Sequence, residues 1–192
     1  EWDSKFFNKR IGRVEGHSLS TAAVEEVERW AKANAVDCIY FLADGSERQH
    51  WVAVEGRGYQ LVDLRVTYQF DLTRYEDKCP PVAQIRAARR EDIAQVKKMA
   101  AEFHQASRFF VDDHFPVEKS REMYEIWIER DFTEENRFLW VFEEGGVVLG
   151  YTSASVHPST GTAEIGLVGV SAEARGRGIG VSLQHHAFHE LK

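Results

Sequence analysis

Apolar residues at helical spacing and in short strand patterns predict a small first lobe of strands and helices. Ser20 can cap a helix over residues 21–34, because the residues after it are apolar at helical spacing. Phe6, Phe7 and residues 11–14 suggest a first strand, and shorter patterns predict a strand over 37–43 and a helix over 47–55. The predicted buried stripe of the first helix consists of Val24, Val27, Trp30 and Ala31.

Residues 62–71 carry the most regular alternation of apolar and polar side chains in the chain. This period predicts a strand with one buried face and one wet face. Charged residues 74–78 and then Cys79, Pro80 and Pro81 break the pattern, and paired prolines stop both a helix and a sheet ladder. We therefore predict a domain boundary here, between a small α/β lobe over residues 1–79 and a second domain over residues 82–192.

The second part begins a new pattern. A short strand over 82–88 precedes a helix whose apolar face carries Ile93, Val96, Ala100 and Phe103. Pro116 suits the first turn of another helix, over about 117–131. Three strands and a final helix follow, with glycine turns between the strands, at residues 138–142, 147–156, 162–171 and 181–191.

Residues 175–180, Arg-Gly-Arg-Gly-Ile-Gly, lie between an apolar run that predicts a buried strand and the last predicted helix. A helix N-terminus presents unpaired N–H groups and a partial positive charge, which favour an anion. Glycines let the backbone approach a ligand closely, and Arg175 and Arg177 can add charge-assisted hydrogen bonds. We interpret this stretch as a phosphate-binding turn rather than as a solvated surface loop.

Two familiar nucleotide-binding patterns fit this turn poorly. The dinucleotide pattern needs a glycine where Val181 stands, and a P-loop needs a lysine that the turn lacks. What remains is Arg-x-x-Gly-x-Gly over residues 175–180, preceded by Gly-Leu-Val-Gly-Val-Ser-Ala-Glu-Ala over 166–174. Together, strand, spacer and turn closely resemble the acyl-CoA signature of the GNAT N-acetyltransferase superfamily.

This resemblance implies acetyl-CoA as co-substrate. In the family, strand residues bond to the pantetheine arm and turn amides hold the pyrophosphate, while a backbone N–H near Val168 would stabilise the oxyanion. The implied cofactor-binding residues are Val168, Gly169, Val170, Arg175, Gly176, Arg177, Gly178, Ile179, Gly180 and Val181.

The order of elements after Pro81 is also that of the GNAT fold. The resemblance implies an α+β fold, with a mixed, mostly antiparallel sheet flanked by helices and a small N-terminal α/β lobe. It also implies a truncated C-terminus, because the tyrosine that commonly donates a proton in this family would lie beyond Lys192. No catalytic acid is therefore assigned. An incomplete sheet would leave strand 162–171 with an open edge, so we expect the chain alone to be poorly soluble or to form a homo-oligomer.

Shorter matches at residues 2–7, 40–42, 61–67 and 107–109 are similar to a bacterial GNAT subgroup, the dTDP-fucosamine acetyltransferases. They imply a nucleotide-linked amino sugar as the amine acceptor. Ser107 and Arg108 would border the acceptor site, and arginine suits a diphosphate, although a surface salt bridge is an equal alternative for Arg108. Glu164 lies on the last strand and is a candidate base, against the commoner reading of a charge on a sheet edge.

Composition limits the partners. The formal charge of −7 argues against nucleic acid and anionic membranes, and no apolar run approaches the length of a membrane span. Cys38 and Cys79 have no metal-binding spacing, and His185 with His189 lacks a third ligand, so we predict ordinary cytoplasmic thiols and no metal. The main hypothesis is an N-acetyltransferase acting on a small-molecule amine. A non-catalytic acyl-CoA-binding or sensing module and an interaction domain that keeps only the fold remain as alternatives.

Overall fold

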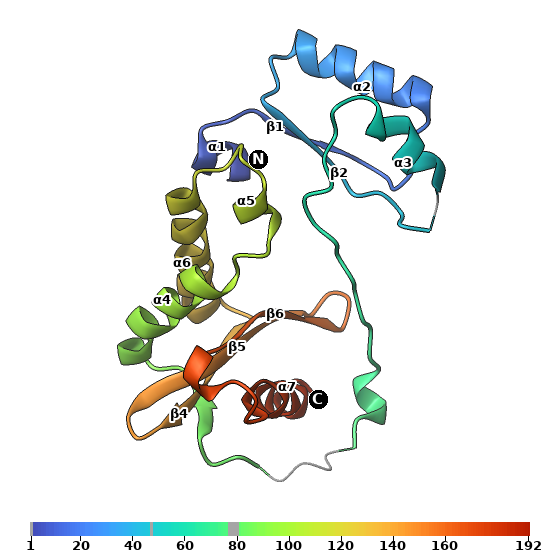
Figure 1. Ribbon diagram of the computed structural model, residues 1–192. Helices are drawn as coiled ribbons and strands as arrows, with labels where there is room; N and C mark the ends of the chain where they lie inside the picture. Colours follow the sequence, from blue (N-terminus) through green and yellow to red (C-terminus); the bar gives the residue numbers. More distant parts are fainter. Residues whose placement is uncertain (1, 47, 77–80) are drawn as a thin grey trace. The chain divides into compact units, whose positions relative to one another are not determined.

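The computed structural model describes residues 2–46, 48–76 and 81–192 and divides the chain into two compact units (Figure 1). One unit comprises Glu1–Leu64 with Val111–Phe115, and the other comprises Arg65–Phe110 with Pro116–Lys192. The predicted boundary at residues 79–82 falls partly outside the described residues and stays a prediction, as does a helix start at Glu47.

The first unit contains a parallel pair of strands and three short helices among its described residues. Ile11 of one strand lies opposite Cys38 of the other. The second helix begins as predicted, because the Ser20 hydroxyl accepts a hydrogen bond from the Ala23 amide at 3.2 Å. The elements are α1 (Trp2–Phe7), β1 (Ile11–Val14), α2 (Thr21–Ala33), β2 (Cys38–Phe41) and α3 (Arg48–Glu55).

Two details of this unit differ from the sequence prediction. Residues 6–7 belong to α1 rather than to a strand, and the Phe6 ring stacks on Trp2, four residues earlier, at 4.8 Å. The buried stripe of α2 is narrower than predicted, since Val24 is fully buried but Trp30 is 54% exposed. The amphipathic pattern therefore identified the helix correctly but overestimated the width of its buried face.

Segment 62–71 is not a strand, and this prediction is wrong. In the described part of the chain the segment pairs with no other strand. Without a partner, its alternating apolar side chains have no buried face to occupy. The exposed ones are Leu64 at 77%, Val66 at 64%, Tyr68 at 91% and Phe70 at 54%.

The second unit is built on an antiparallel sheet with the strand order β3-β4-β5-β6 among its described residues. Gly145 and Gly146 turn the β4–β5 hairpin with positive φ angles of 59° and 81°, as the glycine pair predicts. The remaining elements of the chain are η1 (Leu72–Arg74), β3 (Ile85–Ala87), η2 (Arg90–Asp92), α4 (Ile93–Phe103), α5 (Arg108–Val111), α6 (Val117–Thr133), β4 (Arg137–Glu144), β5 (Val147–His157), β6 (Thr162–Val170), η3 (Ala172–Ala174) and α7 (Ile179–Leu191).

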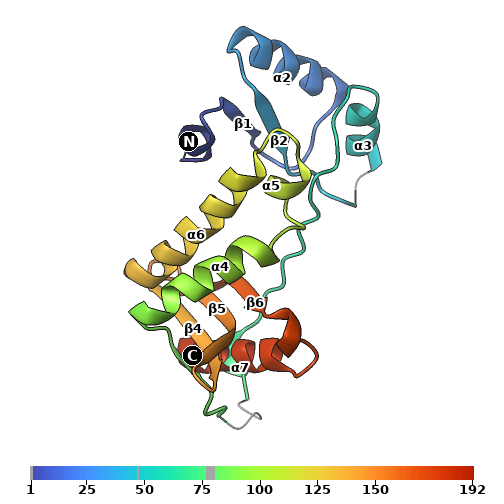
Figure 2. The same cartoon turned by 60° about the vertical axis from the view of Figure 1, so that its left-hand side comes forward.

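Helices α4 and α6 cover one face of this sheet, and α7 covers the other (Figure 2). Neighbouring side chains of β5 point to opposite faces of the sheet, because side chains alternate along a strand. Tyr151 reaches His104 at the end of α4, whereas Thr152 accepts a hydrogen bond from Gln184 of α7 at 3.3 Å. The predicted α+β fold with an antiparallel sheet flanked by helices is confirmed, although the short elements α5 and η3 were not predicted.

A half-buried ionic cluster joins β3, η2 and β4. The Arg86 guanidinium donates to both oxygens of Asp92, at 2.6 and 3.0 Å, and also to Glu143. The hydrogen bonds from Arg86 are the largest cause that lowers the pKa of Asp92, and they outweigh the effect of its burial. The cluster therefore fixes the start of the sheet against the start of α4. Within the described ranges, no helix is both long and apolar enough to cross a bilayer.

Candidate functional site

The glycine turn connects the end of β6 to the start of α7. The chain leaves β6 at Val170, makes the short helix η3, and then turns at Gly176 and Gly178. Both glycines have left-handed backbones, with φ of 76° and 77°, which residues with a β-carbon rarely adopt. Gly178 is the N-cap of α7, and no described side chain caps it. The predicted strand, turn and helix are thus all present in the predicted order.

The first turn of α7 leaves backbone donors for a ligand. Its first intrahelical backbone hydrogen bond runs from the Ser182 amide to the Gly178 carbonyl at 3.0 Å. Helix geometry therefore leaves the amides of residues 179–181 without intrahelical acceptors. A β-carbon added at Gly180 would touch only Val170, at 3.7 Å, so the backbone here is accessible. Several amides at a positive helix terminus form a site suited to phosphate oxygens.

The two arginines of the turn have different partners. Arg175 donates to the Val170 carbonyl at 3.3 Å, and its guanidinium carbon lies 5.6 Å from the Phe103 ring centroid. Arg177 lies 2.8 and 3.0 Å from the two carboxylate oxygens of Glu144, and this contact lowers the pKa of Glu144. An exposed ion pair contributes little, so a phosphate can replace Glu144 at Arg177.

Strand β6 offers an open edge beside the turn. It pairs with β5 along one edge, and no strand in the described ranges pairs with the other. Near Ser153 the register shifts, and the Leu167 amide donates to the Ser153 hydroxyl at 2.9 Å instead of to the β5 backbone. Val168, Gly169 and Val170 resume the pairing beyond this irregularity. An extended ligand with amide groups can therefore bond along these residues.

Two polar side chains, the buried Tyr151 and the partly buried His104, lie behind Gly169. Tyr151 pairs with Gly169 across the sheet, and a β-carbon at Gly169 would come 2.5 Å from the Tyr151 ring. The Tyr151 hydroxyl lies 2.8 Å from His104 Nε2, and the His104 ring stacks on Tyr124 with centroids 4.8 Å apart. Burial lowers the pKa of His104 and raises that of Tyr151. The imidazole is therefore neutral near pH 7 and able to accept a proton.

The sequence analysis missed His104 and Tyr151. His104 follows directly after the apolar face of α4, and Tyr151 reads as an ordinary core residue of β5. Only the pairing of β5 with β6 brings the two side chains to Gly169. The proximity of His104 to the predicted acceptor segment at Ser107 was the one available signal.

The remaining predicted site residues do not all join this cluster. The Ser107 hydroxyl is buried with no hydrogen-bond partner among the described residues, and the Arg108 guanidinium lies 4.3 Å from the Phe109 ring centroid. Glu164 is exposed on β6, four residues before Val168, which corresponds to about 13 Å along a strand. It is therefore not brought to the glycine turn.

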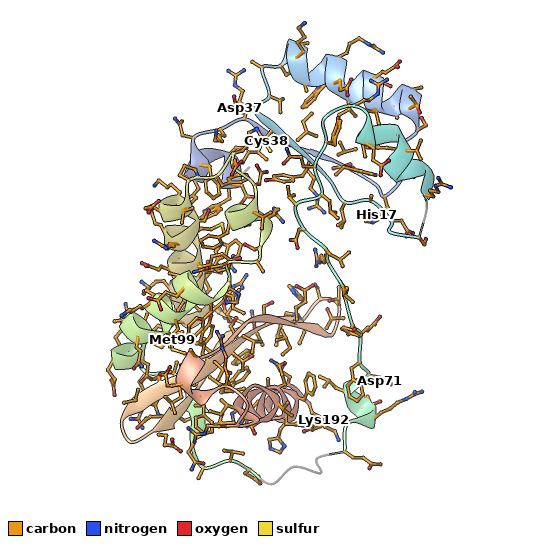
Figure 3. The ribbon with its side chains drawn as sticks, in the orientation of Figure 1. His17, Asp37, Cys38, Asp71, Met99 and Lys192 are labelled. Carbon is orange, nitrogen blue, oxygen red and sulfur yellow. The ribbon has the colours of Figure 1, made fainter. Side chains whose placement is uncertain are left out.

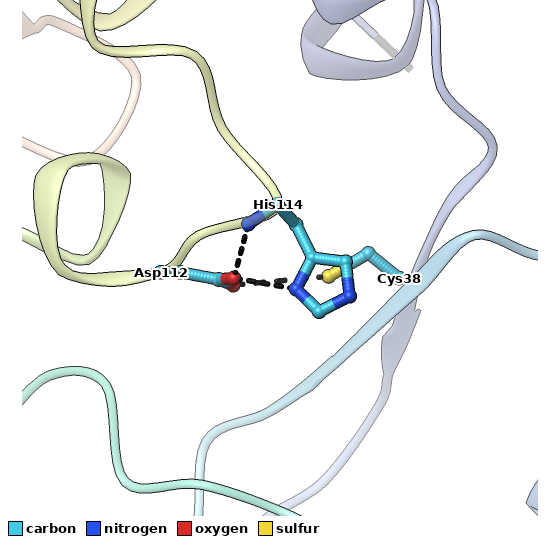
Figure 4. Close-up of side chains that lie close together, drawn as sticks. All are labelled: Cys38, Asp112 and His114. Carbon is cyan, nitrogen blue, oxygen red and sulfur yellow. Dashed lines mark hydrogen bonds and ion pairs between the residues drawn. The ribbon is translucent and has the colours of Figure 1, made fainter.

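Two groups that the sequence analysis considered ordinary have specific contacts. His185 is not simply solvated, because its Nδ1 atom lies 3.0 Å from the Tyr75 hydroxyl. Cys38 lies near Asp112 and His114, which stand more than seventy positions away, and ligand atoms of all three lie within 4.8 Å of one another (Figure 4). Sequence spacing could not show this group, because no short motif contains it.

Comparison with known proteins finds a family match over part of the chain. Residues 100–192 match the model of the acetyltransferase (GNAT) family, and no protein of curated function matches the chain. Among solved structures, the chain is similar to an N-acetyltransferase from Staphylococcus aureus Mu50 (24% identity, TM-score 0.39, covering 56% of this chain and 64% of that chain). It is also similar to a GNAT family acetyltransferase from Brucella melitensis in complex with acetyl-CoA (23%, 0.40, 56% and 66%).

A transcriptional regulator from Bacillus halodurans C-125 is similar at 25% identity, with a TM-score of 0.38, over 55% of this chain and 71% of that chain. The chain thus spans about two thirds of the length of these three proteins. Because their TM-scores do not exceed 0.40, the family match over residues 100–192 supports the functional argument and these structures do not.

Proposed function

We propose that this chain binds acetyl-CoA at the turn after β6 and transfers its acetyl group to a small-molecule amine, and the match of residues 100–192 to the acetyltransferase (GNAT) family model supports this. The observation that carries the proposal is the uncapped N-terminus of α7 beside an open strand edge. The amides of residues 179–181 would hold the pyrophosphate, and residues 168–170 would bond the pantetheine amides.

The transfer needs the thioester to be held while the amine attacks it. The amine nitrogen forms a bond to the carbonyl carbon, the carbonyl oxygen becomes an oxyanion, and the carbon–sulfur bond then breaks. A backbone N–H near Val168 would stabilise the oxyanion, since a fixed donor in a water-poor site favours developing charge. The amine loses one proton, and the departing thiolate gains one.

For the proton that leaves the amine, we assign His104. Its imidazole is held neutral by burial, and it is bonded to the tyrosine that lies behind Gly169. A general base works best when its pKa lies near the working pH, where it is largely deprotonated and still basic. We expect His104→Gln to lower kcat/KM and to remove the rise of kcat/KM with pH on the acidic limb of its profile, while acetyl-CoA affinity stays within about twofold.

For the acceptor, we propose a nucleotide-linked amino sugar. Ser107 supports a polar acceptor, because its buried hydroxyl has no partner among the described residues and can bond to a sugar hydroxyl. Arg108 stands next to it at the start of α5, where a guanidinium suits a diphosphate. Both residues follow His104 by a few positions, so acceptor and base belong to one segment.

Calorimetry with acetyl-CoA tests the binding half of this proposal. Gly180→Asp places a carboxylate in the first turn of α7, where it suits the helix but repels phosphate. We expect at least a tenfold loss of affinity for Gly180→Asp and little change for Gly180→Ala. Gly161→Asp is the control for the added charge, since Gly161 lies in the β5–β6 turn. Equal affinity of Gly180→Asp and wild type would reject the site.

A second assay identifies the acceptor. The protein and acetyl-CoA are incubated with dTDP- and UDP-amino sugars, polyamines, amino acids and peptides, and released CoA thiol is measured. Turnover with a nucleotide amino sugar supports the proposal, and turnover of another amine alone would exclude the narrower acceptor class. Acetyl-CoA binding with no turnover of any amine would instead favour a non-catalytic acyl-CoA-binding module.

A further inference from the structure

We propose that Cys38, Asp112 and His114 form a zinc-binding site in the first compact unit. Cys38 begins β2, and the other two residues belong to the short segment Val111–Phe115, which packs with the same unit. Figure 4 shows the Cys38 sulfur and the His114 ring converging on the Asp112 carboxylate. Thiolate, imidazole and carboxylate are the three ligand types that zinc uses in proteins.

The distances already approach those of a zinc site. Cys38 Sγ lies 4.0 Å from Asp112 Oδ2, and His114 Nδ1 lies 2.6 Å from Asp112 Oδ1. Ordinary zinc bond lengths at tetrahedral angles place ligand atoms about 3.3–3.6 Å apart. Reaching that geometry needs changes of less than about 1 Å in each of these two separations. The His114 side chain is 59% exposed and therefore has room to rotate.

Asp112 is positioned by donors that would remain outside the metal shell. The Tyr40 hydroxyl donates to it at 2.8 Å, and the His114 backbone amide donates at 2.9 Å. Such outer donors orient a ligand carboxylate.

The ligand set selects zinc over the common hard cations. Calcium and magnesium take oxygen ligands, and neither favours a thiolate or an imidazole. Zinc binding would displace the Cys38 thiol proton to solvent. The bound ion, one thiolate and one carboxylate then sum to zero charge, which limits the cost of partial burial. Three protein ligands leave a fourth position for water or another ligand.

Zinc titration of the reduced, metal-stripped chain tests this proposal, with a chromophoric chelator as competitor. We expect one zinc per chain, and at least a tenfold weaker affinity for both Cys38→Ser and His114→Ala. Two matched controls, Cys79→Ser and His17→Ala, each remove the same residue type elsewhere and should stay within about twofold. His17 lies apart from Cys38 in the same unit (Figure 3).

Cobalt substitution gives a second readout that does not depend on affinity. A thiolate-to-cobalt absorption band should appear in wild type and vanish in Cys38→Ser, while circular dichroism confirms that the variant is folded. No zinc uptake by wild type, or equal uptake by the ligand variants and the controls, would overturn the proposal. The outcome is independent of the acetyl-CoA assay, because these three residues are not part of the unit that carries the glycine turn.

Discussion

Strand β6 and segment 62–71 have similar alternating sequences but opposite structures. Along β6, odd-numbered apolar positions such as Ile165 are at least half-buried, and the strand pairs with β5 over most of its length. Segment 62–71 alternates more regularly, yet Tyr68 is 91% exposed and no strand of the described residues pairs with the segment. Alternation of apolar and polar residues therefore suits a segment to pair with the edge of a neighbouring strand, but it does not provide that strand.

Short turns in the sequence bring the partner strand of β6 beside it. Gly145 and Gly146 form the hairpin that brings β5 against β4, and the turn after His157 then brings β6 against β5. Segment 62–71 instead continues into η1, where the Asp71 side chain caps the helix at the Thr73 amide. Neither end of the segment has a hairpin turn that would bring another strand beside it, so the segment stays unpaired among the described residues.

The largest expected effect distinguishes Tyr151, which lies on β5 opposite Gly169 of β6, from Tyr68 of segment 62–71. Tyr151→Ala should lower the free energy of unfolding by about 3–5 kcal/mol, because it empties a fully buried site and removes the hydroxyl bonded to His104. Tyr68→Ala should change it by less than about 0.5 kcal/mol. Urea unfolding measures both, and a cost above 1 kcal/mol at Tyr68 would show that segment 62–71 is packed after all.

A smaller effect comes from adding one methyl group behind β6. Gly169→Ala would place a β-carbon 2.5 Å from Tyr151 and 3.1 Å from Phe103, so we expect a loss of about 1–3 kcal/mol. Gly180→Ala is the control, because its β-carbon makes only a 3.7 Å contact and alanine favours a helix. Thermal unfolding of both variants measures this difference in stability. Equal stability of Gly169→Ala and Gly180→Ala would contradict the prediction.

The partly buried His104 predicts that the free energy of unfolding depends on pH. Burial lowers its folded pKa below the ordinary value of 6.5, so the unfolded chain binds the proton more tightly. This group's contribution to stability is therefore complete above about pH 6.5 and falls as the pH drops below it, with a slope of at most about 1.4 kcal/mol per pH unit. Urea unfolding from pH 7.5 to 5 should be flatter for His104→Gln, and parallel curves would contradict the assignment.

The smallest effect concerns backbone protection. Amides of residues 65–70 should exchange with deuterium nearly as fast as those of an unfolded peptide, because no strand of the described residues pairs with them. Amides in the β5–β6 ladder should exchange only when the unit opens. Val66→Thr should leave both rates unchanged. Slow exchange at residues 65–70 would mean that this segment acquires a strand partner in solution.

Sequence patterns predicted most of the second unit because its elements are specified within short stretches. The 3.6-residue period marked α4, Pro116 marked the start of α6, and the glycine pair marked the β4–β5 hairpin. The turn over residues 175–180 was recognised from its own residues, and the structure gives Gly176 and Gly178 the left-handed backbones that such a turn needs. What local pattern predicted poorly was burial, as the exposed Trp30 shows.

By itself, the sequence determined most of the helices and strands and the glycine turn after β6, since propensity, period and turn chemistry act over a few neighbouring residues. Tertiary structure decided which side chains meet. His104 reaches Tyr151 only through the packing of α4 on β5, and Cys38 reaches Asp112 only through the folding of the first unit. Such contacts join residues 47 and 74 positions apart, and no local pattern encodes them. Segment 62–71 shows the same limit, because a strand exists only where another strand can pair with it.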